Sequence, residues 1–183
     1  MVALVRAMQE GRVVADPALV LSSDPAAGAL QRAAELGVPA AVVDASAHRG
    51  DRAGFEAALQ RALDAAGAEF ICLAGFMRIL TPDFVARWQG RMLNIHPSLL
   101  PLFPGLDTHA RAIASGMAVH GATVHEVTAD LDTGPIRGQA IVPIEPGDTP
   151  ERLAARLLQM EHRLYPLVLD RVLRGETAPI LLT

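Results

Sequence analysis

Aromatic residues and cysteines are scarce in this sequence of 183 residues: Phe, Trp and Tyr make up 4%, and there is one Cys. One cysteine cannot form an internal disulfide, which excludes a disulfide-stapled extracellular module. Cys72 lies within the apolar run of residues 70–74, so we expect a small buried side chain. Because 51% of the residues are hydrophobic and few are aromatic, the core has to be built from Ala, Val, Leu and Ile.

Long apolar runs and blocks of like charge are also missing. No segment has the roughly 18 uncharged apolar residues of a membrane span, and the first residues lack a signal-peptide pattern. The 16 basic and 20 acidic residues leave a net charge of −4 without a block of either sign. This balance argues neither for nucleic acid nor for an anionic membrane surface as a partner. We therefore expect a soluble, cytoplasmic protein.

Helix-like and strand-like segments alternate along the first half of the chain. The expected helices cover residues 2–10, 25–36, 51–66 and 82–88, and the strands 13–22, 40–43, 69–74 (fully buried) and 92–95. This rhythm is typical of an α/β fold with a mostly parallel, doubly wound, Rossmann-like sheet and helices on both faces. Strands at 122–127 and 136–142 then pair and make the C-terminal part mixed. A long helix begins at Thr149-Pro150, and Pro166 should kink or interrupt it.

The densest functional signal is the segment LNIHPSLLP at residues 93–101. Asn94 and His96 are two positions apart on a predicted strand, so their side chains face the same side. They lie at the carboxyl end of that strand, where open α/β sheets bind ligands. Acyl transfer to an amine needs a donor for the developing oxyanion, which an Asn amide or a protonated His provides. It also needs a group that moves protons near neutrality, which suits His.

A catalytic histidine usually has an orienting carboxylate, and Asp132 in the loop LDTGP at 131–135 is the obvious source. Each residue alone also has an ordinary interpretation, since a His after a strand is more often packing and Asp-Thr-Gly-Pro is more often a turn. A metal site is disfavoured, because His120 and His125 would face opposite sides of one strand and no second Cys exists. Ser98 lacks the Gly-x-Ser-x-Gly elbow of a nucleophile.

Several motifs in fixed order resemble the glycinamide ribonucleotide formyltransferases of purine biosynthesis, over nearly the whole chain. They are LAGFMRIL (73–80), LNIHPSLLP (93–101), FPGLDTH (103–109), HGATVH (120–125), LDTGPI (131–136) and, more weakly, QMEHRLYP (159–166). The resemblance implies a one-carbon transfer with 10-formyltetrahydrofolate as donor and no metal. The implied acceptor is the amine of glycinamide ribonucleotide.

The resemblance also implies roles for individual residues. Asn94, His96 and Asp132 match the catalytic positions. The donor-binding positions are matched by Met77, Arg78, Ile79, Leu80, Val85, Asn94, His125 and Asp132. The acceptor-binding positions are matched by Arg52 for the phosphate and Glu161 for the ribose, together with Ile95 and Pro97.

The resemblance implies a single formyltransferase domain over residues 1–183, with an acceptor-nucleotide-binding half (1–90) and a folate-binding and catalytic half (91–183). The family begins with a strand and a Gly-x-Gly-Ser-Asn loop that binds the acceptor phosphate at a helix N-terminus. This sequence starts with the helix that follows that loop. We therefore expect the first half to be incomplete at its N-terminus, through a truncated or misassigned start.

Other folate-using families share the Asn-x-His and Asp elements. The loop PGLDTH at 104–109 and the net charge of −4 favour the purine enzyme over tRNA formyltransferases. Two alternatives stay open: a formyltetrahydrofolate hydrolase, and a folate-binding remnant without turnover. We expect small-molecule partners only, and a homodimer stays open.

Overall fold

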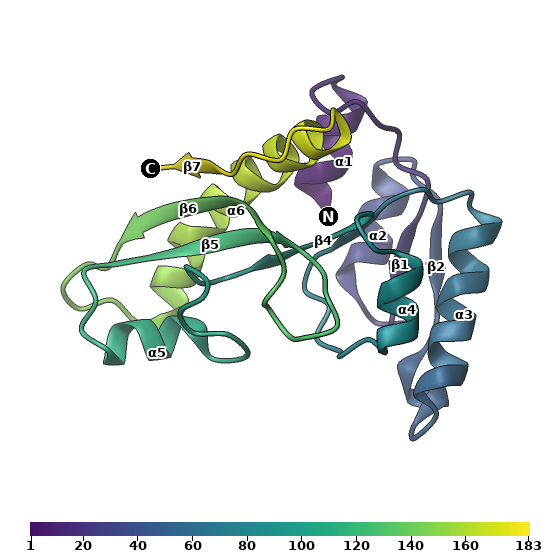
Figure 1. The fold of residues 1–183 in the computed structure, drawn as a ribbon, viewed down its shortest axis with the longest axis horizontal. Helices are drawn as coiled ribbons and strands as arrows, with labels where there is room; N and C mark the ends of the chain where they lie inside the picture. The colour runs from purple at the N-terminus through teal and green to yellow at the C-terminus, as the bar shows by residue number, and fades with distance from the viewer.

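The computed structural model describes all residues, 1–183, as an α/β fold (Figure 1). Its helices are α1 (Val2–Gln9), α2 (Gly28–Glu35), α3 (Arg52–Ala65), α4 (Pro82–Arg87), α5 (Thr108–Ala114) and α6 (Pro150–Leu173), with a 3₁₀ turn η1 (Ala45–His48). Its strands are β1 (Val20–Ser22), β2 (Ala40–Val42), β3 (Ile71–Leu73), β4 (Met92–His96), β5 (Val119–Glu126), β6 (Ile136–Pro143) and β7 (Ile180–Leu182). The expected α/β class is therefore confirmed.

The strands form two sheets that share no hydrogen-bonded neighbours. β1 and β2 form a parallel pair, and the other five strands are ordered β3-β4-β5-β6-β7. In the larger sheet β3 runs parallel to β4 and β6 parallel to β7, whereas the β4–β5 and β5–β6 pairs are antiparallel. The expected strand pair at 122–127 and 136–142 is thus present as the antiparallel strands β5 and β6, which extend the parallel strands that carry the Asn94 motif.

Local sequence explains where the two proline-led helices begin. The Thr81 hydroxyl accepts from the backbone N–H of Phe84 at the start of α4, and Thr149 does the same for Arg152 at the start of α6. Each helix has proline in its first turn, where the missing N–H would be unpaired in any case. Both starts match the sequence-based expectation.

The structure differs from the expected elements in several places. Helix α6 is not interrupted at Pro166 but continues to Leu173, because its apolar face packs against β5 and β6. This burial outweighs the roughly 3 kcal/mol that an interior proline costs. Strand β3 is only partly buried, since it forms an edge of the larger sheet. The predicted strand 13–22 is reduced to Val20–Ser22, and α5 and β7 were not anticipated.

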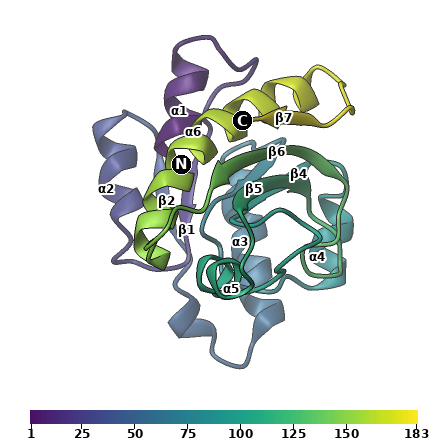
Figure 2. The same cartoon turned by 90° about the vertical axis from the view of Figure 1, so that its left-hand side faces the viewer.

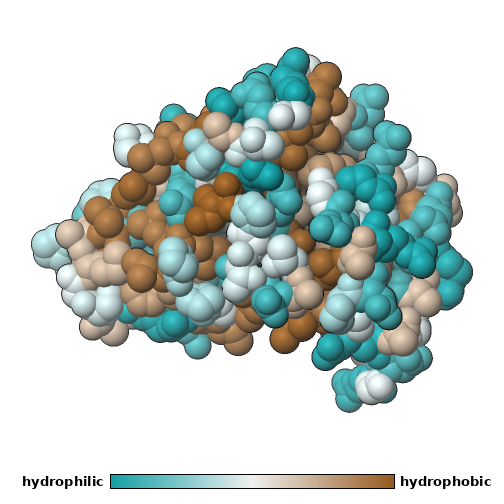
Figure 3. Space-filling model, viewed as in Figure 1, coloured by the Kyte–Doolittle hydropathy of each residue, from teal (hydrophilic) through white to brown (hydrophobic).

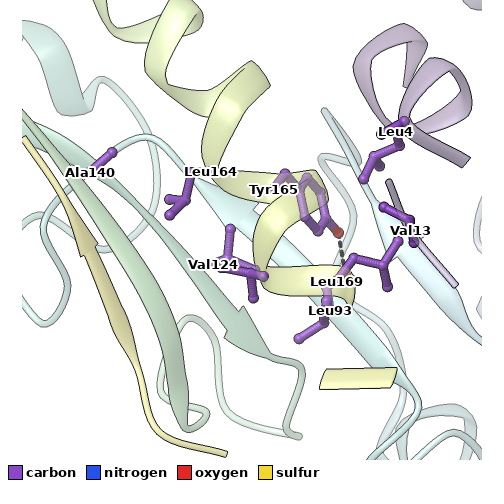
Figure 4. Close-up of a cluster of buried hydrophobic side chains, with 10 residues drawn as sticks. Leu4, Val13, Leu93, Val124, Ala140, Leu164, Tyr165 and Leu169 are labelled. Atoms are coloured by element: carbon purple, nitrogen blue, oxygen red, sulfur yellow. Dashed lines mark hydrogen bonds between the residues drawn. The ribbon is translucent and has the colours of Figure 1, made fainter. Parts of the chain in front are cut away.

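One of the two large cores lies between α6, α1 and the five-stranded sheet, and Figures 1 and 2 show α6 lying along that sheet. Leu164, Val168 and Leu169 of α6 meet Leu93 and Val124 of the strands in this core (Figure 4). The hydroxyl of Tyr165 donates to the carbonyl of Leu93 and lies equally close, 3.0 Å, to that of Leu73. Tyr165 thereby fixes β3 and β4 relative to one another just before Asn94.

A second core joins α3 to α4 and supports the other side of β4. Phe55, Leu59 and Leu63, the periodic apolar residues of α3, are buried here with Phe84 and Trp88. In Figure 3 apolar residues gather over the strands at the left, whereas the right-hand side, over α3, is mostly hydrophilic. None of the helices combines the length and apolar character that a membrane crossing requires.

Candidate active site

The site is built around the carboxyl end of β4. Asn94 and His125 are direct partners in the antiparallel register of β4 and β5, so their side chains lie on one face. Asn94 Nδ2 donates to His125 Nε2 at 3.2 Å, and His125 Nδ1 donates to the carbonyl of Glu126 at 2.8 Å. Burial lowers the pKa of His125, which keeps its ring neutral and leaves Nε2 as an acceptor. The Asn94 amide is therefore held in one orientation, with one Nδ2 proton unused by His125.

His96 lies two residues farther along β4 and is only 7% exposed. Its Nε2 lies 3.0 Å from the carbonyl oxygen of Phe103, and its Nδ1 lies 3.5 Å from Oδ2 of Asp132. Both neighbours are acceptors, so the imidazolium form alone can donate to both. The geometry suits a histidine that stabilises negative charge and carries a proton between two groups.

Asp132 reaches this site from the loop between β5 and β6. Its backbone is in the left-handed region at φ 54°, which is uncommon for a residue other than glycine. Its side chain is 6% exposed, and Oδ2 accepts from the backbone N–H of Gly105 at 2.9 Å while Oδ1 lies 3.7 Å from His125 Nε2. The carboxylate thus lies between His96, His125 and Gly105.

Gly134 allows the Asp132 loop to pass close to β5. A Cβ atom at position 134 would lie 1.8 Å from the carbonyl oxygen of Glu126, which is closer than any side chain can tolerate. That same carbonyl accepts the Nδ1–H of His125. Glycine at this position therefore lets the Asp132 loop pass close to the same carbonyl that orients the His125 ring.

A buried polar network shapes the segment that follows His96. The Thr123 hydroxyl donates to the carbonyl of Ser98 at 2.7 Å and accepts from the N–H of Leu100 at 3.0 Å. Gln139 Nε2 lies 3.0 Å from both Thr123 Oγ1 and the Leu100 carbonyl. Ser98 is fully buried, and its hydroxyl donates to the Leu102 carbonyl at 2.6 Å, so it is a structural group and not a nucleophile.

A cavity of about 800 Å³ opens next to the carboxyl end of β3. This end adjoins the site, because Leu73 of β3 is the register partner of Asn94. The cavity combines an apolar side with cationic groups and brings together four of the predicted donor-binding residues. Its lining includes Met77, Arg78, Ile79 and Leu80 with His48, Arg49, Arg52, Phe55 and Glu56.

The structure separates Arg52 and Glu161, the residues predicted to bind the phosphate and the ribose of the acceptor. Arg52 lines the cavity with the predicted donor-binding residues, whereas Glu161 does not line it and faces the amino group of Met1. Burial raises the pKa of the Glu161 carboxyl. Arg52 thus lies with the predicted donor-binding residues and apart from Glu161.

The other predicted binding residues lie outside the cavity. Val85 is buried in the core between α3 and α4, and Ile95 packs into the cores beneath the sheet. The backbone of Pro97 lies next to the ring of His120. Cys72 is packed against the main core, where burial raises the pKa of its thiol to about 12, as expected for an inert cysteine.

His109 and His120 form a pair behind the site. His120 Nε2 lies 3.1 Å from His109 Nδ1. Burial lowers the pKa of His120 to about 4, so the pair is neutral. No three His, Cys, Asp or Glu side chains are arranged to hold a metal ion.

Sequence reasoning missed the backbone groups that complete the site. The Phe103 carbonyl and the Gly105 N–H contact His96 and Asp132, yet neither involves a side chain that a motif could reveal. Arg111, Thr123 and Gln139 were missed as well, because their contacts depend on loop geometry and not on sequence spacing.

The formyl transferase family matches residues 1–169 of this chain. The chain belongs to the formyl transferase family. Within this family, the phosphoribosylglycinamide formyltransferase of Escherichia coli (strain K12) is 41% identical over 92% of this chain and 79% of its own length. The family that the sequence motifs indicated is thereby confirmed.

Longer proteins also contain this formyl transferase domain. The trifunctional purine biosynthetic protein adenosine-3 of Gallus gallus is 41% identical over 94% of this chain, which spans only 17% of that relative's length. Among solved structures, glycinamide ribonucleotide transformylase 1 from Symbiobacterium toebii superposes with a TM-score of 0.91 at 43% identity. That superposition covers 95% of this chain and 82% of the other.

Proposed function

We propose that this formyl transferase moves the formyl group of 10-formyltetrahydrofolate to the amine of glycinamide ribonucleotide in purine biosynthesis. The observation that carries the proposal is the convergence of Asn94, His96 and Asp132 at the end of β4. The activities for which the relatives from Escherichia coli and Symbiobacterium toebii are named support the choice of reaction.

In this reaction the acceptor nitrogen attacks the formyl carbon, whose oxygen becomes negatively charged. The unused Nδ2 proton of Asn94 is available to donate to that oxygen, because His125 holds the amide in a fixed orientation. A preorganised donor of this kind contributes roughly 3–4 kcal/mol to transition-state stabilisation. Asn94 therefore acts on the oxyanion and His125 acts as its positioning residue.

Breaking the bond between the formyl carbon and the folate nitrogen requires a proton to move from the attacking amine to the leaving nitrogen. His96 beside Asp132 is the group suited to this transfer and to stabilising the oxyanion as an imidazolium. Asp132 keeps the ring oriented and balances its charge. Reaching a substrate requires His96 to exchange its contact with the Phe103 carbonyl for one with the reacting atoms.

The cavity beside β3 is suited to the donor. A folate has flat rings with apolar faces and an anionic tail, and the cavity offers contacts for both. Met77 and Ile79 present apolar side chains that are 75% and 59% exposed, and Arg52 and Arg78 supply positive charge. We propose Arg52 as an anion-binding residue of this cavity, and Glu161 with Pro97 as acceptor-side groups.

The remaining assignments are proposals that follow from this reaction. We propose a cytoplasmic protein with small-molecule substrates and no nucleic-acid partner, in keeping with its net charge of −4 and single cysteine. We also propose that the chain is one domain in which the second half, 91–183, supplies the catalytic groups. The cavity residues come from the first half, between Ser23 and Leu80.

A formyl-transfer assay tests the proposal. Purified chain is incubated with 10-formyltetrahydrofolate and glycinamide ribonucleotide, and the products are separated by mass. Formylated ribonucleotide is the expected product. Free formate without formylated acceptor would instead indicate a hydrolase, and donor binding without turnover would indicate a folate-binding remnant.

A further inference from the structure

Residues 103–106 carry the two backbone groups that contact His96 and Asp132. The Phe103 carbonyl meets His96 Nε2 at 3.0 Å, and the Gly105 N–H donates to Asp132 Oδ2 at 2.9 Å. The position of this short loop therefore determines how both side chains are oriented. The contacts that hold the loop in place are distinct from the chemical roles of the two side chains.

The loop makes no hydrogen bond to any other backbone group. Leu102 before it is tied down by Leu99 and Ser98, and Asp107 after it accepts from the N–H of Arg111 in α5. Between these points, the hydrogen bonds to residues 103–106 come from three side chains only: His96, Asp132 and Arg111.

Arg111 holds the loop through its guanidinium group. Its Nη1 donates to the carbonyl of Pro104 at 2.7 Å and to that of Leu106 at 3.1 Å. Its guanidinium also lies over the Phe103 ring, with 5.4 Å between Cζ and the ring centroid. One side chain thus contacts the loop at three of its four residues.

The loop needs such support because its backbone is strained. Phe103 in the loop and Asp107 directly after it have φ values of 54° and 57°, in the left-handed region that residues other than glycine rarely adopt. Conformations of this kind persist only when the surroundings hold them. His96 and Asp132 cannot supply all of this support, since the proposed reaction requires His96 to leave the Phe103 carbonyl.

We propose that Arg111 is a positioning residue that keeps residues 103–106 in the conformation required by His96 and Asp132. The inference rests on the proposed formyl transfer and adds a residue that the family motifs do not assign. Arg111 contacts neither reacting group, so it acts on the rate through the loop and not on substrate binding.

The test compares R111M, which keeps the aliphatic chain but loses the donors, with R111K, which keeps a donor group. R61M is the control, because Arg61 is an exposed residue of α3 with no side-chain hydrogen bond or ion pair. We expect R111M to lower kcat at least about tenfold with both KM values within about threefold, since small misplacements of catalytic groups are costly. R111K should regain most of the loss, because a single Nη1 makes both bonds in the native loop.

A second readout does not depend on turnover. In nitrogen-15 spectra of the histidine rings, R111M should shift the His96 signals and leave those of exposed His162 unchanged. A wild-type chain that does not transfer formyl counts against the proposed function, and the ring spectra then test Arg111 alone. An R111M protein with kcat within threefold of wild type, an R111K protein as slow as R111M, or an unchanged His96 spectrum would overturn the proposal.

Discussion

Asn94 and His125 face each other across β4 and β5, and the amide of one donates to the buried, neutral ring of the other. This contact fixes the directions in which the oxygen and the nitrogen of the Asn94 amide point. Without it, the amide can rotate and present either its oxygen or its nitrogen to a substrate.

Replacing His125 by Phe tests this relationship. H125F keeps a ring of similar size but removes the acceptor for Asn94 Nδ2, so we expect kcat to fall about 10- to 100-fold. Steady-state kinetics and the thermal midpoint would be measured together, with H162F on the exposed face of α6 as control. A normal kcat with a lowered midpoint would make His125 a packing residue only.

Replacing Asp132 by Asn tests the pairing with His96. Asn can still accept from the Gly105 N–H, so the loop should keep its place. Loss of the charge beside His96 Nδ1 should nevertheless lower kcat by about 10²–10⁴. D130N changes an exposed carboxylate of the same loop and should behave as wild type. Activity of D132N within threefold of wild type would remove Asp132 from the mechanism.

Replacing Arg52 by Ala tests which substrate enters the cavity. Because Arg52 shares the cavity with Met77, Arg78, Ile79 and Leu80, we expect R52A to raise the KM of the folate donor about tenfold or more. The acceptor KM should change less, and R61A should change neither. A selective rise in the acceptor KM would instead support the phosphate-binding role implied by the sequence resemblance.

The stability of the protein should depend on pH through His120. Its pKa is lowered to about 4 by burial, so between pH 6.5 and 4 the unfolded chain binds a proton that the folded ring does not. Stability is therefore complete above pH 6.5 and falls as the pH drops, by up to about 3 kcal/mol from this residue. Denaturant unfolding measured from pH 7 to 4 should show the loss. H120Q should flatten the slope while H162Q keeps it, and equal slopes in both variants would contradict the assignment.

Much of the fold followed from the sequence because its signals are local. The four-residue spacing of Phe55, Leu59 and Leu63 indicated α3, and Thr149-Pro150 marked the start of α6. Helix α5 was missed because it has seven residues and no clear apolar period. The continuation of α6 through Pro166 depends on tertiary packing, which local propensity does not contain.

The site was predictable in part for the same reason. Asn94 and His96 are linked by strand periodicity, and the Asp132 loop stood out as a turn between two strands. That Asn94 meets His125, however, depends on the register of β4 and β5 and on the irregularity of β5 at Val124/His125. The Phe103 carbonyl and Gly105 N–H depend on a loop conformation that no residue type specifies.

The division of the strands into two sheets has a consequence for local unfolding. The β1–β2 pair and α2 bury a small core of Val5, Val20, Ala33 and Val38, separate from the core beneath Asn94. Small cores open with lower free energy than large ones, so amides in residues 20–42 should exchange with solvent faster than those of β4 to β6. Ser23 and Ala45, at the edge of this region, also line the cavity. Ligand binding in the cavity should therefore slow hydrogen exchange in β1 and β2. The part of the fold that opens most easily is then the part that a bound ligand stabilises.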